Sequence, residues 1–124
     1  MNIQELSVGD WVRHTFYEEN VRIARIDGDS ERVLTERGKL SISCHLNHFE
    51  PIPLTPKILE MNGWREDKTD PNFFATDEVY IYNHDGIWRL RPKSPELLIV
   101  VDVKYIHELQ HALRLLGVEN NIEL

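Results

Sequence analysis

The chain has 124 residues, of which 41% are hydrophobic and 28% are charged, which excludes a disordered polypeptide and suits one compact domain or two small lobes. Its net charge of −7 disfavours a general electrostatic grip on nucleic acid. The single cysteine, Cys44, excludes an internal disulfide. The N-terminus has neither a basic leader nor an apolar run, and the longest apolar run, Leu97 to Val101, is short of a membrane span. We therefore expect a cytoplasmic protein.

Residues 1–54 are predicted to form short strands. The segments SVGDWVRHTF, VRIARID, RVLT and KLSIS have strand-like patterns, and DGDS at 27–30 is typical of a turn in which Gly28 is free to take positive φ. This spacing favours a small bent antiparallel sheet or barrel of the SH3-like kind.

Residues 55–124 are predicted to form a second lobe, although one compact domain with a shared core is an alternative. Thr55 is expected to cap a short linking helix that Asn62 and Gly63 end. VYIYNHDGIWRLRP predicts an antiparallel hairpin that turns at its Asp-Gly pair. After LLIVV, which suits a buried strand or a lead into the next helix, Asp102 is expected to cap a C-terminal helix that packs on the hairpin sheet. The expected fold class is therefore α+β.

The segment HELQH, His107 to His111, matches the H-E-x-x-H pattern of zinc hydrolases, in which two histidines hold the metal and the glutamate activates water. A helical wheel argues against this function, because it places both histidines opposite a core-facing stripe of Tyr105, Leu109, Ala112, Leu113 and Leu116. The downstream third ligand of metzincins is also missing. We expect no metal and no cofactor, and a zinc-dependent hydrolase using His107, Glu108 and His111 is kept as an alternative.

Other groups of residues carry weaker signals. In CHLNH, strand geometry directs Cys44 and His48 to one face and His45 to the other, so the three are not expected to converge. Arg89, Arg91 and Lys93 form a local basic patch on one strand, which solvation explains better than nucleic-acid binding. The hairpin aromatics are candidates for a binding surface, with Tyr80 and Tyr82 on one face and Trp88 on the next strand.

The order of LSVGDWV, PIPLTPKILEMNGW, the Asp-Gly hairpin and KYIHELQHALRLLG resembles a family of small uncharacterised proteins from Bacteroidetes genomes, their prophages and mobile elements. The resemblance spans nearly the whole chain, and its most specific part is a C-terminal KYVHQLQ-like helix. In that pattern glutamine commonly stands at Glu108 and asparagine at His111, whereas His107 and Gln110 match it. The resemblance implies an architecture, a genomic setting and some structural or binding role for His107 and Gln110, but no reaction.

We therefore predict a non-catalytic binding or adaptor module of phage or mobile-element origin that acts on a protein partner. Its candidate binding residues are Tyr80, Tyr82, Trp88, His107 and Gln110. The alternatives are the zinc-dependent hydrolase and a nucleic-acid-binding small β-barrel.

Overall fold

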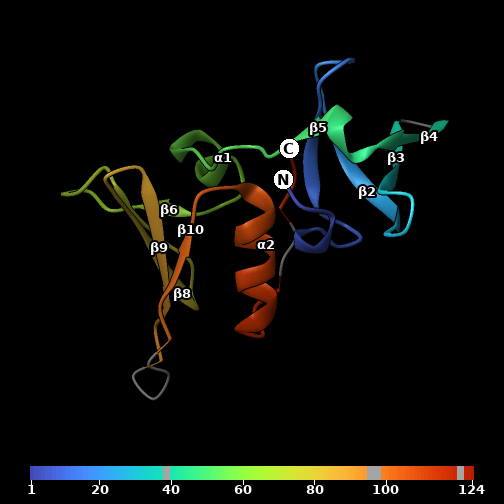
Figure 1. The fold of residues 1–124 in the computed structure, drawn as a ribbon. Coiled ribbons are helices and arrows are strands. Elements are labelled where there is room, and N and C mark those ends of the chain that lie inside the picture. Colours follow the sequence, from blue (N-terminus) through green and yellow to red (C-terminus); the bar gives the residue numbers. More distant parts are fainter. Residues whose placement is uncertain (38–39, 95–98, 120–121) are drawn as a thin grey trace. The chain divides into compact units, whose positions relative to one another are not determined.

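The computed structural model describes residues 1–37, 40–94, 99–119 and 122–124, and the chain divides into two compact units, Met1–Ile52 and Pro53–Leu124 (Figure 1). The predicted boundary was at Leu54. The fold class is α+β, as predicted, because each unit contains a five-stranded antiparallel sheet and the second unit adds two α-helices. Among the described residues, no helix is both long enough and apolar enough to cross a membrane.

The first unit is a sheet with the strand order β4-β3-β2-β1-β5. Its strands are β1 (Trp11–His14), β2 (Glu19–Asp27), β3 (Arg32–Arg37), β4 (Leu40–His45) and β5 (Phe49–Glu50), and two 3₁₀ turns are η1 (Ile3–Glu5) and η2 (Leu46–His48). All neighbouring strands pair antiparallel, and β2 has an irregularity between Ile23 and Arg25. The closer comparison with SH3-like barrels stays a prediction.

Alternation of apolar and polar residues explains the core of the first unit, because successive strand side chains point to opposite faces. In β2, Val21 and Ile23 are buried, whereas Arg22 between them is exposed. The core cluster consists of Leu6, Val12, Val21, Ile23, Val33, Leu46 and Phe49. In the turn after β2 the left-handed conformation falls on Glu31, with φ of 52°, and not on Gly28 as we expected.

The second unit is a sheet with the strand order β10-β9-β8-β7-β6, and the helix α2 lies beside it, in contact with β10 (Figure 1). The strands are β6 (Arg65–Glu66), β7 (Phe73–Ala75), β8 (Val79–His84), β9 (Ile87–Pro92) and β10 (Val101–Val103), and the helices are α1 (Pro56–Met61) and α2 (Ile106–Leu115). One sheet face is buried through Phe74, Val79, Ile81, Trp88, Leu90 and Val103.

Local signals placed α1 and the hairpin correctly. The Thr55 hydroxyl accepts a hydrogen bond from the Ile58 backbone N–H at 3.3 Å, and Gly63 after the helix has φ of 83°. Asp85 and Gly86, with φ of 53° and 83°, form the two-residue turn between β8 and β9. Both φ values are positive, as a type I′ hairpin turn requires.

The start of the last helix differs from the prediction. Asp102 lies in β10, where it pairs with Arg89 of β9, and Tyr105 is the N-cap of α2. The segment LLIVV ends in a strand, because its last residue, Val101, opens β10, whereas Ile99 and Val100 precede the strand. Leu97 and Leu98 of that segment lie outside the described residues. By sequence alone Asp102 is a suitable helix cap, but in the structure it pairs with Arg89 across the two strands and so belongs to the sheet.

Candidate functional site

The histidine pair of HELQH does not point outward as the helical wheel predicted. His107 is only 3% exposed and Gln110 only 2%, while His111 is half-buried. The ring of His107 stacks on that of Tyr105, with centroids 5.9 Å apart and planes 7° apart, and meets the His111 ring edge-on at 5.9 Å. The predicted stripe is correct for Leu109, Ala112 and Leu113 but too narrow. The helix buries a wider arc of its surface than the hydrophobic stripe on the helical wheel indicates. The prediction that His107 faces solvent was therefore wrong.

Glu108 has a local role in the helix. Its Oε1 accepts hydrogen bonds from the backbone N–H groups of Lys104 at 2.9 Å and Tyr105 at 3.1 Å. These donors precede the first helical turn, where N–H groups have no partner within the helix. A glutamate at the third helical position that reaches back in this way is half of a capping box. The carboxylate that a zinc hydrolase would use to activate water therefore stabilises the start of α2.

The described part of the chain contains no group of three or more His, Cys, Asp or Glu side chains that could hold a metal ion. A structural zinc site needs four ligands and a catalytic one needs three protein ligands. The His107–His111 pair therefore lacks the further protein donors that such a site requires within residues 1–37, 40–94, 99–119 and 122–124.

The CHLNH segment meets a partner that the sequence analysis missed. The Cys44 sulfur lies 3.4 Å from Nε2 of His14, a residue of β1 that is 2% exposed. The Nδ1 atom of His14 accepts the backbone N–H of Tyr17 at 3.3 Å, so we assign the ring proton to Nε2, which donates to the sulfur. His48 stacks on His14 at 6.1 Å.

His45 is directed elsewhere, as strand alternation predicted. Its Nδ1 accepts the Asn47 backbone N–H at 3.1 Å, and its Nε2 lies 3.5 Å from a Glu31 carboxylate oxygen. Nothing in the sequence near Cys44 pointed to His14, because thirty residues separate the two and only the β-sheet brings them together. The pair is a half-buried thiol beside a buried imidazole.

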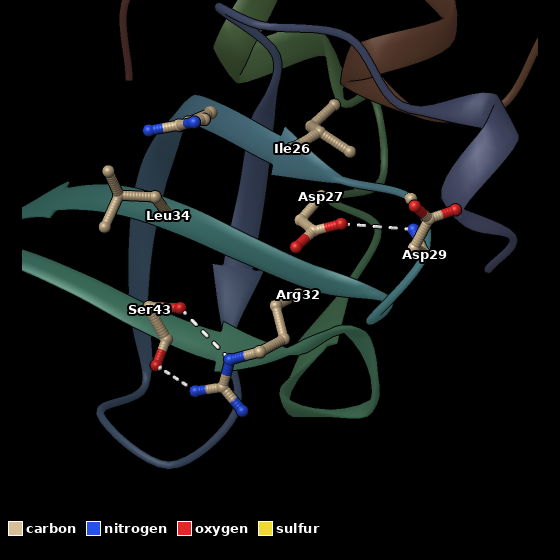
Figure 2. Close-up of a pocket in the computed structure, with 8 residues that line it drawn as sticks. Ile26, Asp27, Asp29, Arg32, Leu34 and Ser43 are labelled. Atoms are coloured by element: carbon tan, nitrogen blue, oxygen red, sulfur yellow. Dashed lines mark hydrogen bonds between the residues drawn. The ribbon is translucent and has the colours of Figure 1, made fainter.

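The first unit also contains an open cavity of about 590 Å³ between the turn after β2 and the strands β3 and β4 (Figure 2). Two of its charged side chains, those of Asp27 and Arg32, form local hydrogen bonds. Asp27 accepts the backbone N–H of Asp29 at 3.1 Å, and Arg32 donates to the hydroxyl and carbonyl oxygens of Ser43 at 3.2 and 2.8 Å. The hydrogen bonds from Ser30 hold the pKa of Asp27 below its usual value. The cavity is thus lined by groups that shape the turn and the strand pair.

The candidate binding aromatics of the second unit occupy different environments. Trp88 is 2% exposed, and its indole N–H donates to the Leu54 carbonyl at 3.1 Å, so it belongs to the core. Tyr80 and Tyr82 are half-buried and lie on the opposite face of the sheet. The predicted binding residues did not include Phe73, which is half-buried and lies on the neighbouring strand β7, opposite Tyr82. Its ring centroid is 5.3 Å from that of Tyr80 and 6.2 Å from that of Tyr82, with the latter pair nearly parallel at 6°.

Strand register brings basic residues to the same face as these rings. Tyr80 is paired with Arg91 and Tyr82 with Arg89, and directly opposed residues of antiparallel strands share a face. The Arg91 guanidinium carbon lies 5.5 Å from the Tyr80 ring centroid and the Lys93 ammonium nitrogen 5.0 Å from it, within cation–π range. We call this surface the aromatic–cationic face, which consists of Phe73, Tyr80, Tyr82, Arg89, Arg91 and Lys93.

Two carboxylates neutralise part of the positive charge on and beside this face. Asp102 accepts a hydrogen bond from Arg89 at 3.0 Å. This bond is the main reason why the pKa of Arg89 is raised, and a smaller contribution comes from Tyr82. Asp77 binds Arg65 of β6 at 2.8 Å, and this bond holds the pKa of Asp77 below its usual value. The face offers apolar area and positive charge to a ligand.

Comparison of the chain with models of known protein families, with curated proteins and with solved structures finds no match.

Proposed function

We propose that the protein is a non-catalytic binding module that contacts a protein partner through the aromatic–cationic face. The observation that carries the proposal is the half-exposed cluster of Phe73, Tyr80 and Tyr82 on the open face of the second sheet. Aromatic residues and arginine are enriched at the centres of protein interfaces, where they supply large contact areas at low cost in side-chain entropy.

The packing of the face supports this proposal. Phe73 contacts both tyrosine rings, and Arg91 and Lys93 lie over Tyr80. These side chains are therefore packed against one another in the protein without a partner. Side chains that are ordered in the free protein lose less entropy on binding, which favours affinity. The opposite face of the same sheet is buried in the core, and it gives the exposed face a rigid base.

Neither alternative has comparable support. The hydrolase would need Glu108 for chemistry, but that carboxylate caps the helix. General nucleic-acid binding would have to overcome the net charge of −7. An origin in a phage or mobile element rests on the sequence resemblance alone.

A random-peptide display selection against the immobilised protein tests the proposal. The double variant Phe73→Ala/Tyr82→Ala removes two rings of the face. The matched control Phe16→Ala/Tyr17→Ala removes the same residue types from a first-unit turn, where the rings are 76% and 38% exposed. Peptides selected on the wild-type protein should bind the control variant equally well and the face variant about tenfold more weakly, or worse, by fluorescence anisotropy. Equal binding to both variants, or no enrichment of any peptide, would contradict the proposal.

A further inference from the structure

Only some of the basic side chains on and beside the aromatic–cationic face form ion pairs with carboxylates. Arg89 of this face and Arg65 beside it each bind a carboxylate, at 3.0 and 2.8 Å. Arg91 and Lys93 form no ion pair within the part of the chain that the structure describes, although Lys93 is near enough to Asp77 to help lower the pKa of that carboxyl. Both cations lie over the same ring, that of Tyr80. In a protein with net charge −7, two adjacent cations without a bound carboxylate form a local site of opposite sign. Electrostatic complementarity then favours an anionic ligand at this place.

The spacing of the two cations suits an extended polypeptide. Arg91 lies in β9, and Lys93 continues the same ladder, because its backbone N–H donates to the Glu78 carbonyl at 2.9 Å. Side chains two residues apart in a strand are separated by roughly 7 Å on the same face. An extended partner segment has the same repeat, so carboxylates at its positions i and i+2 can reach Lys93 and Arg91 together. The next residue on that side, i+4, then falls beside Tyr82 and Phe73.

We infer that the partner segment is an extended acidic stretch with two carboxylates two residues apart, followed two residues later by an apolar side chain. This inference rests on the proposed function and adds the chemistry of the partner to it. The carboxylates bind Lys93 and Arg91, and the apolar side chain packs on Phe73 and Tyr82, while Asp102 keeps Arg89 from taking a third carboxylate.

The same observations favour a peptide over single-stranded nucleic acid. Nucleic-acid sites combine open rings for base stacking with a row of cations that follows the phosphates. Here two cations already lie over Tyr80, and Phe73 lies against both tyrosines. The carboxylates of Asp77 and Asp102 beside the face would also repel a phosphate chain. A short segment with two negative charges needs no open ring for base stacking, and it meets less of this repulsion than a phosphate chain because it carries fewer charges.

The test uses the full chain and a synthetic peptide with two glutamates separated by one threonine, then threonine and phenylalanine. Its controls are a peptide with lysine in place of glutamate and an octamer of thymidine. The variant Arg91→Glu/Lys93→Glu reverses the charge of both cations that lie over Tyr80. Its matched control, Lys57→Glu/Lys104→Glu, changes the net charge equally at exposed positions of the second unit outside the face.

Isothermal titration should show that the glutamate peptide binds the wild-type protein and the control variant alike. The Arg91→Glu/Lys93→Glu variant should bind it about tenfold more weakly or worse and should prefer the lysine peptide, and added salt should weaken the wild-type complex. Tighter binding of the thymidine octamer than of the glutamate peptide would overturn the inference. Unchanged binding of the glutamate peptide to the reversed variant would also overturn it. The proposed function would still stand if display-selected peptides lost affinity for Phe73→Ala/Tyr82→Ala.

Discussion

The role of Glu108 can be tested by comparing two substitutions that a catalytic and a structural glutamate tolerate differently. Glu108→Ala removes both hydrogen bonds to the backbone N–H groups of Lys104 and Tyr105, at 2.9 and 3.1 Å. Loss of such a cap costs about 1–1.5 kcal/mol in the free energy of unfolding. Glu108→Gln keeps an acceptor oxygen at the same place and loses only the charge near the helix N-terminus, which is worth about 0.5 kcal/mol. We therefore expect glutamine to preserve most of the stability that alanine removes.

The assay is urea denaturation followed by tryptophan fluorescence in a Trp11→Phe background. The remaining fluorophores, Trp64 and Trp88, are both buried in the second unit, so the signal reports the unit that contains α2. The Ala variant should also melt about 3–6 °C below the parent. Equal destabilisation by alanine and glutamine, or none by either, would refute the capping role. Stoichiometric zinc in untagged, dialysed protein would refute the reasoning as well, because it would restore a metal function to HELQH.

Four further substitutions test other parts of the fold. Trp88→Phe removes a buried 3.1 Å hydrogen bond to a backbone carbonyl and part of the core volume, and it should cost about 2–3 kcal/mol in urea denaturation. Gly86→Ala places a side chain at φ of 83° and should cost about 1 kcal/mol, whereas Gly28→Ala, outside the left-handed region and with open space around its Cβ, should cost little or slightly stabilise. The hydrogen bond from Arg65 holds the pKa of Asp77 below its usual 3.8. The contribution of this ion pair to the stability of the folded protein is therefore present above about pH 3.8 and is lost as pH falls through the folded-state pKa of Asp77. Carboxyl-carbon NMR should show a midpoint below 3.8 that returns toward it in Arg65→Ala.

Local features were predictable where a few neighbouring residues decide the conformation. The cap at Thr55 and the turn at Asp85 and Gly86 depend on backbone and side-chain groups within four residues, and both are present as predicted. The alternation along β8 likewise placed Tyr80 and Tyr82 on one face and Ile81 on the other. These patterns were enough for the α+β class and for two of the ring positions of the candidate surface.

Errors arose where distant partners compete with a good local choice. Asp102 is a plausible helix cap by sequence, but it pairs with Arg89 in the sheet and accepts a hydrogen bond from that side chain. His107 lies opposite the most hydrophobic stripe of its helix and is nevertheless buried. Helical periodicity ranks the faces of a helix by polarity, but it does not tell how many of them the folded chain will cover.

The amino-acid sequence by itself determined the class of fold, the cap at Thr55, the turn at Asp85 and Gly86, and the two-residue repeat that places the tyrosines together. Only the tertiary structure decided that Phe73 joins them, that Arg91 and Lys93 share one ring, and that His14 meets Cys44. The physical reason is range. Hydrogen bonds and side-chain alternation act between residues close in the chain, whereas burial and charge pairing depend on strand register, which joins residues far apart in it.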